Sequence, residues 1–527
     1  MTEDQAPAQR RWRAACPNCG APVEFASSAS PSAVCSFCRS TLLREGEVLR
    51  KTGESAELFA DYSPLQIGTQ GRFQNEPFTI LGRVQLAYEG GRWNEWHAYF
   101  DNSGKSAYLS EDNGRFVLSW PLPLAQPPAR AELRLGAQQI VDGQSFRVAA
   151  LTEASLHAAE GELPQAPRLG EPVFVVELRS SRDEVGSLEF VGPEALPRWS
   201  LGRAVDLPAL QLAQTREESA ATWSGRSLQC PSCGAAIQPE LSQSQSITCG
   251  QCQAVVELSG DQANAPADLH FHQQAIGTPP PIPLGRTGHL ALERGGNKLP
   301  WQVVGFMERC SAPDDEGEQY FWREYLLFNK AQGFAFLVDA TEGWSLVRVL
   351  TGAPDMVMNS ARWQGQTFAL HERYSAITTH VLGEFYWKVQ RDERCDVTDY
   401  RGSGGVLSRE QSGNEITWSL GRSIDSAEVG AAFRLDKTAQ ARIQNDPKPL
   451  SGNTGDTLKG IAVFIFIALL LIVLMKACSR DECETYEQRF GAQSLEYQQC
   501  KANQRRSGYS GGSYSGGGSG FGGGGHK

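Results

Sequence analysis

The sequence predicts a mainly β protein, built from two tandem copies of a short cysteine module and a small β-barrel or sandwich, followed by one transmembrane helix and a Gly-rich tail. Three observations predict this class. The pentapeptide WSLGR occurs twice, at 199–203 and 418–422. Eight of the 13 cysteines fall in four CxxC pairs. The stretches between them alternate apolar or aromatic residues with polar ones and are separated by Gly-containing turns, which is typical of strands.

The repeat extends well beyond WSLGR. CPNCG, FTILG, WNEWHAYF, GQSF and LGE in the first half match CPSCG, WQVVG, WREYLLFN, GQTF and LGE in the second half, in the same order. The separations between matching blocks drift by only a few residues, which indicates duplication with loop insertions. The period is too long for a solenoid, so the copies are predicted to be tandem domains.

The two cysteine modules are predicted to be zinc ribbons. In a CxxC pair both thiolates face one ion, and two such pairs complete a closed four-sulfur site of structural type. Gly20 and Gly234 follow a pair at the position that often needs positive φ. Iron in a rubredoxin-like site uses the same ligands, whereas thioredoxin-like redox chemistry needs a βαβ context that is absent. The predicted ligands of two structural zinc ions are Cys16, Cys19, Cys35 and Cys38, and Cys230, Cys233, Cys249 and Cys252.

A chain of 527 residues is long enough for three or four domains. The predicted segments are zinc ribbon 1 at 14–45, β module 1 at 60–205, zinc ribbon 2 at 228–258, β module 2 at 275–425, a linker at 443–459, a transmembrane helix at 460–477, a helical juxtamembrane segment at 478–506 and a disordered Gly/Ser-rich tail at 507–527. The net charge of −11 argues against nucleic-acid binding, because that needs an excess of Lys and Arg.

An uninterrupted apolar run occupies residues 460–475 between two lysines. Sixteen residues at ~1.5 Å each give about 24 Å, and the flanking lysines can extend this toward the ~30 Å of a bilayer core. Eight thiolates favour a reducing compartment, and the N-terminus has no secretory signal. We therefore expect a single-pass protein of the cell inner membrane, with most of the chain cytoplasmic and the tail outside. Cys483 and Cys500 would then be candidates for a disulfide.

Few residues suggest chemistry. A glutamate lies between aromatic residues in both copies, as a candidate ligand or partner surface: Trp93, Glu95 and Trp96, and Trp322, Glu324 and Tyr325. The plainer interpretation is an aromatic cluster beside a solvent-facing carboxylate. His270 and His272 lie in a predicted linker, and Cys310 and Cys395 have no counterparts in the first copy. GxSxG, HExxH and P-loop motifs are absent, so the sequence does not predict an enzyme.

The ribbon followed by a β-rich body with a Glu-Trp/Tyr strand resembles a bacterial family known as a domain of unknown function, number four-one-seven-eight, here present twice. The Gly-x-x-x-Tyr-Leu and Gly-x-x-x-Leu-Val stretches at 104–109 and 333–338 also fit. The resemblance implies a membrane-linked bacterial protein, with genomic neighbours resembling polyamine synthases and envelope-stress proteins.

Three functional hypotheses follow. The leading one is a membrane-anchored cytoplasmic adaptor or scaffold that binds protein partners, because tethered duplicate modules raise effective concentration. The second is a ligand sensor or enzyme that uses Glu95 and Glu324. The third is a nucleic-acid-binding ribbon protein, which the charge disfavours.

Overall fold

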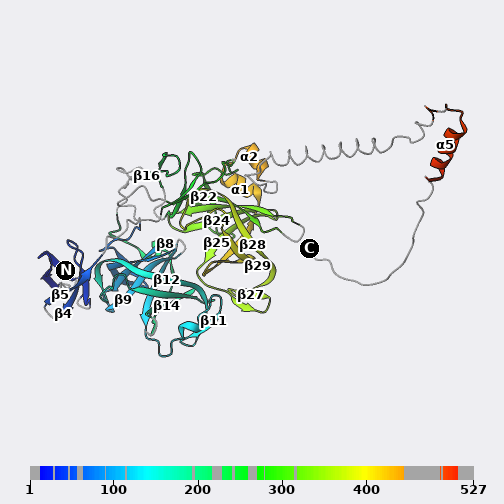
Figure 1. Ribbon diagram of the computed structural model, residues 1–527. Coiled ribbons are helices and arrows are strands. Elements are labelled where there is room, and N and C mark those ends of the chain that lie inside the picture. Colours follow the sequence, from blue (N-terminus) through cyan, green and yellow to red (C-terminus); the bar gives the residue numbers. More distant parts are fainter. Residues whose placement is uncertain are drawn as a thin grey trace. The chain divides into compact units, whose positions relative to one another are not determined.

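The computed structural model divides into two units, Met1–Ser451 and Gly452–Lys527. Figure 1 shows the strands of the first unit. The structure describes residues 12–25, 27, 30–45, 48–55, 63–89, 91–112, 115–192, 196–216, 228–239, 244–258, 270–277, 279–313, 317–443, 487, 489 and 491–507.

Each cysteine module is a set of short antiparallel hairpins. Module 1 contains β1 (Trp12–Ala15), β2 (Pro22–Phe25), β3 (Ser32–Val34), β4 (Ser40–Glu45) and β5 (Val48–Glu54). Module 2 contains β16 (Leu228–Gln229), β17 (Ala236–Ile237), β18 (Ser246–Thr248), β19 (Val255–Glu257) and β20 (Phe271–His272). In both modules one CxxC pair lies between the strands of the first hairpin and the other between the strands of the second, as in β3–β4 and β18–β19.

The first β body, barrel 1, is a closed ring of eight antiparallel strands. Its strands are β7 (Glu76–Tyr88), β8 (Gly91–Phe100), β9 (Lys105–Asp112), β10 (Arg115–Leu122), β12 (Gln144–Leu163), β13 (Pro172–Arg179), β14 (Glu184–Val191) and β15 (Arg198–Val205). The order around the ring is β7-β8-β9-β10-β15-β14-β13-β12, and β12 returns to β7. The sequence left barrel and sandwich open, and the pairing resolves the body as a barrel.

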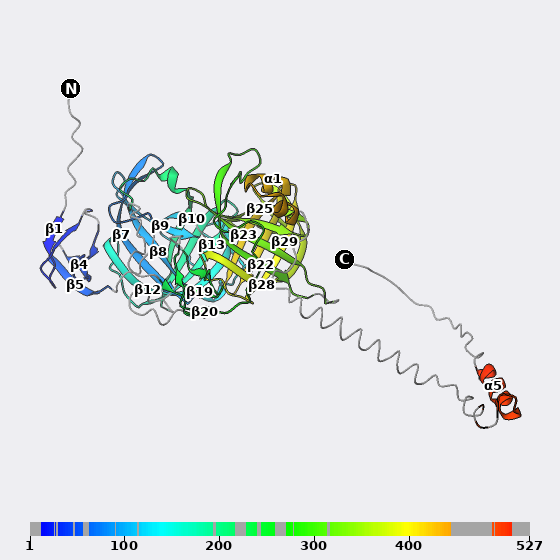
Figure 2. The same cartoon turned by 90° about the horizontal axis from the view of Figure 1, so that it is seen from above.

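The second β body, barrel 2, repeats this topology by its strand pairing. Figure 2 shows several of its strands, among them β22, β23, β28 and β29, from above. Its strands are β22 (Leu299–Ser311), β23 (Phe321–Asn329), β24 (Gly333–Ala340), β25 (Gly343–Leu350), β28 (Gln366–Phe385), β29 (Arg394–Gly402), β30 (Gly405–Ser412) and β31 (Glu415–Ile424). Ala376 of β28 pairs with Ser311 of β22 and with Cys395 of β29. Its two partners lie on opposite edges of β28, so the ring is closed.

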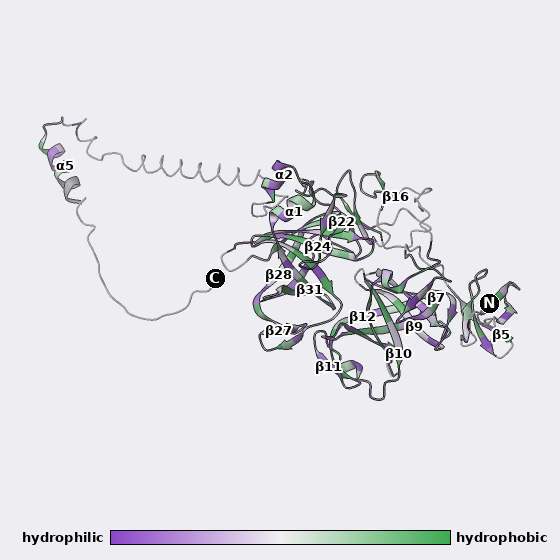
Figure 3. Ribbon diagram, turned by 180° about the vertical axis from the view of Figure 1, so that it is seen from behind, coloured by the Kyte–Doolittle hydropathy of each residue, from purple (hydrophilic) through white to green (hydrophobic). Residues whose placement is uncertain are grey.

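Short elements accompany each ring. They are β6 (Gln70–Phe73), η1 (Arg130–Glu132), β11 (Gln138–Val141) and η2 (Leu207–Leu210) in the first copy, and β21 (Thr287–Leu290), β26 (Asp355–Val357), β27 (Ser360–Trp363), α1 (Ser426–Ala432) and α2 (Lys437–Arg442) in the second. Val429 and Phe433 of the α1 region pack with Trp301 and Tyr325 of barrel 2 in one buried cluster. Leu210 of η2 packs in the corresponding cluster of barrel 1. Figure 3 shows hydrophobic residues running through barrel strands such as β22 and β24.

The two faces of each ring therefore differ. One face carries the large apolar clusters, and because helix α1 and η2 contribute to them, this is the outer face. The other face is the inner one, where side chains from opposite sides of the ring meet. Strand alternation assigns neighbouring residues to opposite faces, so Tyr325 lies outside and Glu324 inside.

Each cysteine module adds a strand to its own barrel. β3 pairs with the end of the 20-residue strand β12, and β18 pairs with the end of the 20-residue strand β28. Ser32 Oγ also donates to the Leu163 carbonyl oxygen at 3.1 Å. The second hairpin of each cysteine module thus joins the sheet of its barrel, whereas the first hairpins, β1–β2 and β16–β17, are separate two-stranded sheets.

In the second unit the described helix is α5 (Leu495–Ser507), which overlaps the predicted juxtamembrane segment at 478–506 and ends one residue beyond it. No helix within the described ranges is long and apolar enough to cross a bilayer. The apolar run at 460–475, the predicted linker at 443–459 apart from its first residue, and the Gly-rich tail after residue 507 lie outside the described residues. Ile443 itself is buried in the apolar cluster of barrel 2. The transmembrane helix therefore stays a prediction from the sequence.

Candidate metal centres and polar clusters inside the barrels

The four cysteines of each module converge on one point. The Sγ atoms of Cys16 and Cys38 are 3.6 Å apart, and those of Cys19 and Cys35 are 3.7 Å apart. In module 2 the equivalent Sγ pairs, Cys230–Cys252 and Cys233–Cys249, are both 3.7 Å apart. Within each module all four Sγ atoms lie within 4.8 Å of one another.

This spacing matches a tetrahedral thiolate site. Zn–S bonds of ~2.3 Å place neighbouring sulfurs of a regular tetrahedron about 3.8 Å apart. Two cysteines of each set are buried, one is half-buried and one is exposed, as in a knuckle that closes around an ion near the surface. The donor set therefore fits a four-coordinate metal ion in both modules, and zinc is the ion that prefers such a site.

The backbone of each knuckle is arranged for this role. Gly20 N–H donates to the Cys16 carbonyl at 2.9 Å with φ of 75°, and Gly234 adopts φ of 76°. The positive φ predicted at both glycines is confirmed. The second knuckles place Arg39 and Gln253 in the same left-handed region, with φ of 57° each, although neither is a glycine.

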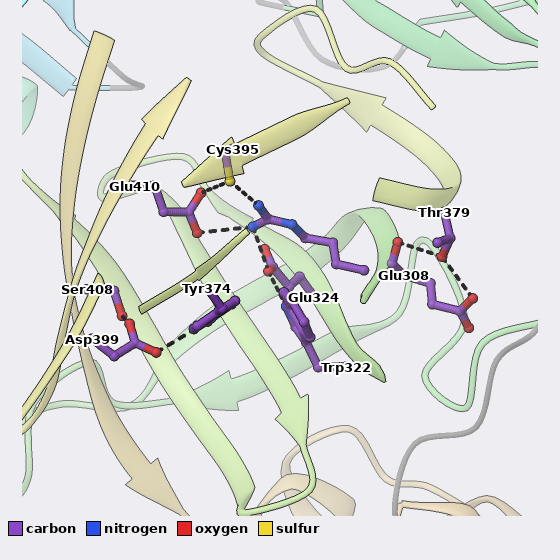
Figure 4. A network of polar contacts seen from close by, with 10 residues as sticks. Glu308, Trp322, Glu324, Tyr374, Thr379, Cys395, Asp399, Ser408 and Glu410 are labelled. Atoms are coloured by element: carbon purple, nitrogen blue, oxygen red, sulfur yellow. Dashed lines mark hydrogen bonds and ion pairs between the residues drawn. The ribbon is translucent and has the colours of Figure 1, made fainter. Parts of the chain in front are cut away.

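Inside barrel 2 a guanidinium joins carboxylates from opposite sides of the ring (Figure 4). Arg309 Nη1 of β22 lies 3.0 Å from Glu324 Oε1 of β23 and 3.0 Å from Glu410 Oε1 of β30. Its Nη2 donates to Cys395 Sγ of β29, and its Cζ lies 5.7 Å from the Trp322 ring centroid. Arg309 and Glu324 are 7% and 11% exposed, so water screens their pairing weakly.

The cluster continues along the same face. Trp322 Nε1–H donates to Glu324 Oε1 at 2.7 Å, and the Trp322 and Tyr374 rings meet edge to face. Tyr374 O–H donates to Asp399 Oδ2 at 3.2 Å, and Ser408 donates to the other oxygen of that carboxylate. Five strands of barrel 2 thus contribute to one polar network (Figure 4).

Barrel 1 repeats part of this network. Trp93 Nε1–H donates to Glu95 Oε1 at 3.0 Å, the same bond that Trp322 makes to Glu324. Glu189 of β14 occupies the place of Glu410 and pairs with Arg198 at 3.1 Å. Tyr108 of β9 is close enough to both carboxylates for their charges to affect it electrostatically.

Burial shifts the ionisation of these groups. The pKa of Glu95 is raised to about 7, first by burial and then by the nearby charge of Glu189, whereas the bond from Trp93 and the charge of Arg198 lower it. Burial also raises the pKa of Glu324, although Arg309 opposes this. The phenol of Tyr108 has a raised pKa for the same reason, because burial and the carboxylates disfavour a phenolate.

The six residues that the sequence suggested as a ligand or partner surface lie on two different faces of the barrels. Trp93, Glu95, Trp322 and Glu324 share the inner faces of their barrels. Trp96 and Tyr325 are fully buried in the outer apolar clusters, so they take no part in the same site. The alternative of a solvent-facing carboxylate does not describe Glu324, which is 11% exposed.

Sequence reasoning missed Arg309, Glu189 and Glu410. A signal was present, because Ser-x-Glu precedes WSLGR in both copies, as Ser187-Leu188-Glu189 and Ser408-Arg409-Glu410. Each serine and glutamate lies on the strand that pairs with the WSLGR strand.

Other residues noted in the sequence lie elsewhere. Cys395 belongs to the inner cluster, and Cys310 is buried on β22. His272 belongs to β20, which pairs with the ribbon strand β19, and its Nε2 lies 3.4 Å from Glu257. Cys483 lies outside the described residues, as does the Cys500 side chain, so their disulfide stays a prediction.

Two regions of the chain, residues 66–207 and 297–426, match one family model, the Domain of unknown function (DUF4178). Together they cover more than half of the 527 residues. The chain belongs to the DUF4178 family. No curated protein and no solved structure matches it.

The two DUF4178 regions contain all eight ring strands of barrel 1 and of barrel 2, respectively. The duplication predicted from WSLGR is thus a duplication of the DUF4178 domain. The two four-cysteine clusters lie in the parts of the chain that the family model does not match.

Proposed function

We propose that this DUF4178 protein is a zinc-stapled binding scaffold rather than an enzyme, and that it acts as an adaptor for protein partners at a membrane. The observation that carries the proposal is the sheet that the second hairpin of each ribbon shares with its barrel. β3 extends β12, and β18 extends β28, so an ion in each four-cysteine site fixes a ribbon on the edge of its barrel. A structural metal that orders a small module supplies a rigid surface rather than a reactive centre.

Duplication supports an adaptor role. Two equivalent ribbon–barrel units in one chain can engage two sites of a dimeric or repeated partner, and tethering makes the second contact effectively intramolecular. The predicted span at 460–477 would add a membrane anchor, with the thiolates on the cytoplasmic side of the inner membrane and the tail outside. Cysteine labelling of intact cells tests this orientation, and labelling of Cys16 from outside would overturn it.

The experiment for the scaffold is a crosslinked pull-down from membranes with metal analysis. Wild-type protein should hold two zinc ions per chain and recover a defined partner set. The double variant Cys35→Ser/Cys249→Ser should lose both ions and that set, whereas Cys310→Ser, a matched loss of a thiol outside the clusters, should keep both. Recovery of the chain alone from wild-type membranes, or an unchanged partner set in the metal-free variant, would refute the proposal.

A second candidate function, ligand binding by the barrels, is favoured by the carboxylates on their inner faces. Glu95 and Glu324 each accept a hydrogen bond from a tryptophan indole on the inner face of a barrel, and a few polar groups among aromatic side chains are common in ligand sites. The double variant Glu95→Gln/Glu324→Gln should abolish a cellular phenotype while the protein still folds and holds zinc. A phenotype identical to wild type would remove this candidate.

A further inference from the structure

The two barrels differ at one position of their inner face. Arg309 of β22 lies opposite Trp322 of β23 in the antiparallel register. The same register in barrel 1 places Leu86 of β7 opposite Trp93 of β8. Barrel 2 therefore carries its own cation at a position where barrel 1 carries an aliphatic side chain.

The surroundings of Arg309 define what this position holds. Its guanidinium contacts two carboxylates, Glu324 and Glu410, and lies near the Trp322 ring. Carboxylates together with an aromatic face are the chemistry by which proteins recognise guanidinium and ammonium groups. In barrel 2 the cation bound by these groups is therefore the side chain of Arg309.

Barrel 1 contains residues equivalent to those that surround Arg309 in barrel 2. Trp93, Glu95 and Glu189 are the counterparts of Trp322, Glu324 and Glu410 by strand register. Tyr108 adds a second aromatic ring near Glu95 and Glu189. We propose that the inner face of barrel 1 binds the guanidinium or primary ammonium group of a small organic cation, in the place that Arg309 fills in barrel 2.

Arg198 does not fill this place. It is half exposed, pairs with Glu189 at 3.1 Å and donates to Gln165 Oε1 at 3.0 Å. Among the described residues, no hydrogen bond or ion pair joins it to Glu95. Glu189 is 25% exposed, so solvent reaches this carboxylate.

The inference rests on the second proposed function, ligand binding by the barrels, and names its ligand class. The test uses ¹⁹F NMR of the full chain labelled with 5-fluorotryptophan, with the Trp93 and Trp322 signals assigned by Trp→Phe variants. The probe is methylguanidinium at constant ionic strength, and N-methylurea is the neutral control of the same shape. The Trp93 signal should shift saturably with methylguanidinium and not with N-methylurea, while the Trp322 signal stays unchanged.

Two reciprocal variants test the position itself. Leu86→Arg installs the barrel 2 residue and should weaken the Trp93 response at least tenfold. Ile140→Arg, which adds the same charge at a side chain 60% exposed, should leave it intact. Arg309→Leu should give the Trp322 signal a saturable response that wild type lacks, an outcome that does not depend on the folding of the Leu86 variant.

The inference would be refuted if the Trp93 signal did not shift with methylguanidinium, or if it shifted equally with N-methylurea. So would an undiminished response in folded Leu86→Arg protein. If the Glu95→Gln/Glu324→Gln variant loses a phenotype while methylguanidinium gives no shift, ligand binding by the barrels stands and the cation assignment fails. The scaffold proposal is independent of all these outcomes.

Discussion

Replacing Arg309 by leucine, the residue at the equivalent position of barrel 1, should destabilise barrel 2 in a pH-dependent manner. The change removes the counterion of Glu324, which is 11% exposed, and of Glu410, which is 40% exposed. Breaking a buried ion pair costs about 3–5 kcal/mol, since a buried charge is left unpaired. The more exposed pair adds at most about 1 kcal/mol. We expect a total loss of about 3–5 kcal/mol near neutral pH.

The sign of the pH dependence follows from the raised pKa of Glu324. Without Arg309 this pKa rises further, and a carboxyl whose pKa is higher in the folded state loses stability as the pH rises. The loss should therefore be larger at about pH 8 than at about pH 5, because protonation of Glu324 removes the unpaired charge.

The assay is urea unfolding followed by tryptophan fluorescence at both pH values. The variant Arg309→Leu/Glu324→Gln removes the orphaned charge and should recover part of the loss at about pH 8. A loss below about 1 kcal/mol at about pH 8, or an equal loss at both pH values, would show that the Arg309 pairs do not stabilise the barrel as inferred.

Three further predictions concern the metal, the first barrel and the long strands. Cys35→Ser should halve the zinc content and make module 1 sensitive to protease while barrel 2 stays resistant; unchanged zinc content would contradict this. Glu95→Gln should be about 1–3 kcal/mol more stable than wild type at about pH 8 and equally stable near pH 4. The reason is that the Glu95 carboxyl has a raised pKa of about 7, so the wild-type protein loses stability as this group ionises with rising pH. Parallel pH profiles of the two proteins in thermal unfolding would refute this prediction. Gly383→Ala should lower the free energy of unfolding by more than about 2 kcal/mol, because φ is 88° and a Cβ would lie 2.2 Å from the Val304 carbonyl oxygen. Gly365→Ala, with φ of 78° and open space around the Cβ, should lower it by about 1 kcal/mol. Equal losses in urea unfolding would refute the steric argument.

The sequence by itself determined the parts of this protein whose signals are local. CxxC spacing predicts that Cys16 and Cys19 can face one ion, because a two-residue gap is a backbone constraint. Strand alternation and WSLGR predict two β bodies of common descent. The positive φ at Gly20 is equally local, since it belongs to the knuckle that the cysteines form.

Only the tertiary structure decided which residues meet inside each ring. Glu410 is 101 residues from Arg309 in the chain, and their contact depends on the order of eight strands and on ring closure. A side chain's face depends on register, and one residue of slip would exchange Glu324 for Tyr325. Ring closure depends on pairing between strands that are distant in the chain, so it cannot be predicted from any single stretch of sequence. The positions of the inner clusters depend on this closure.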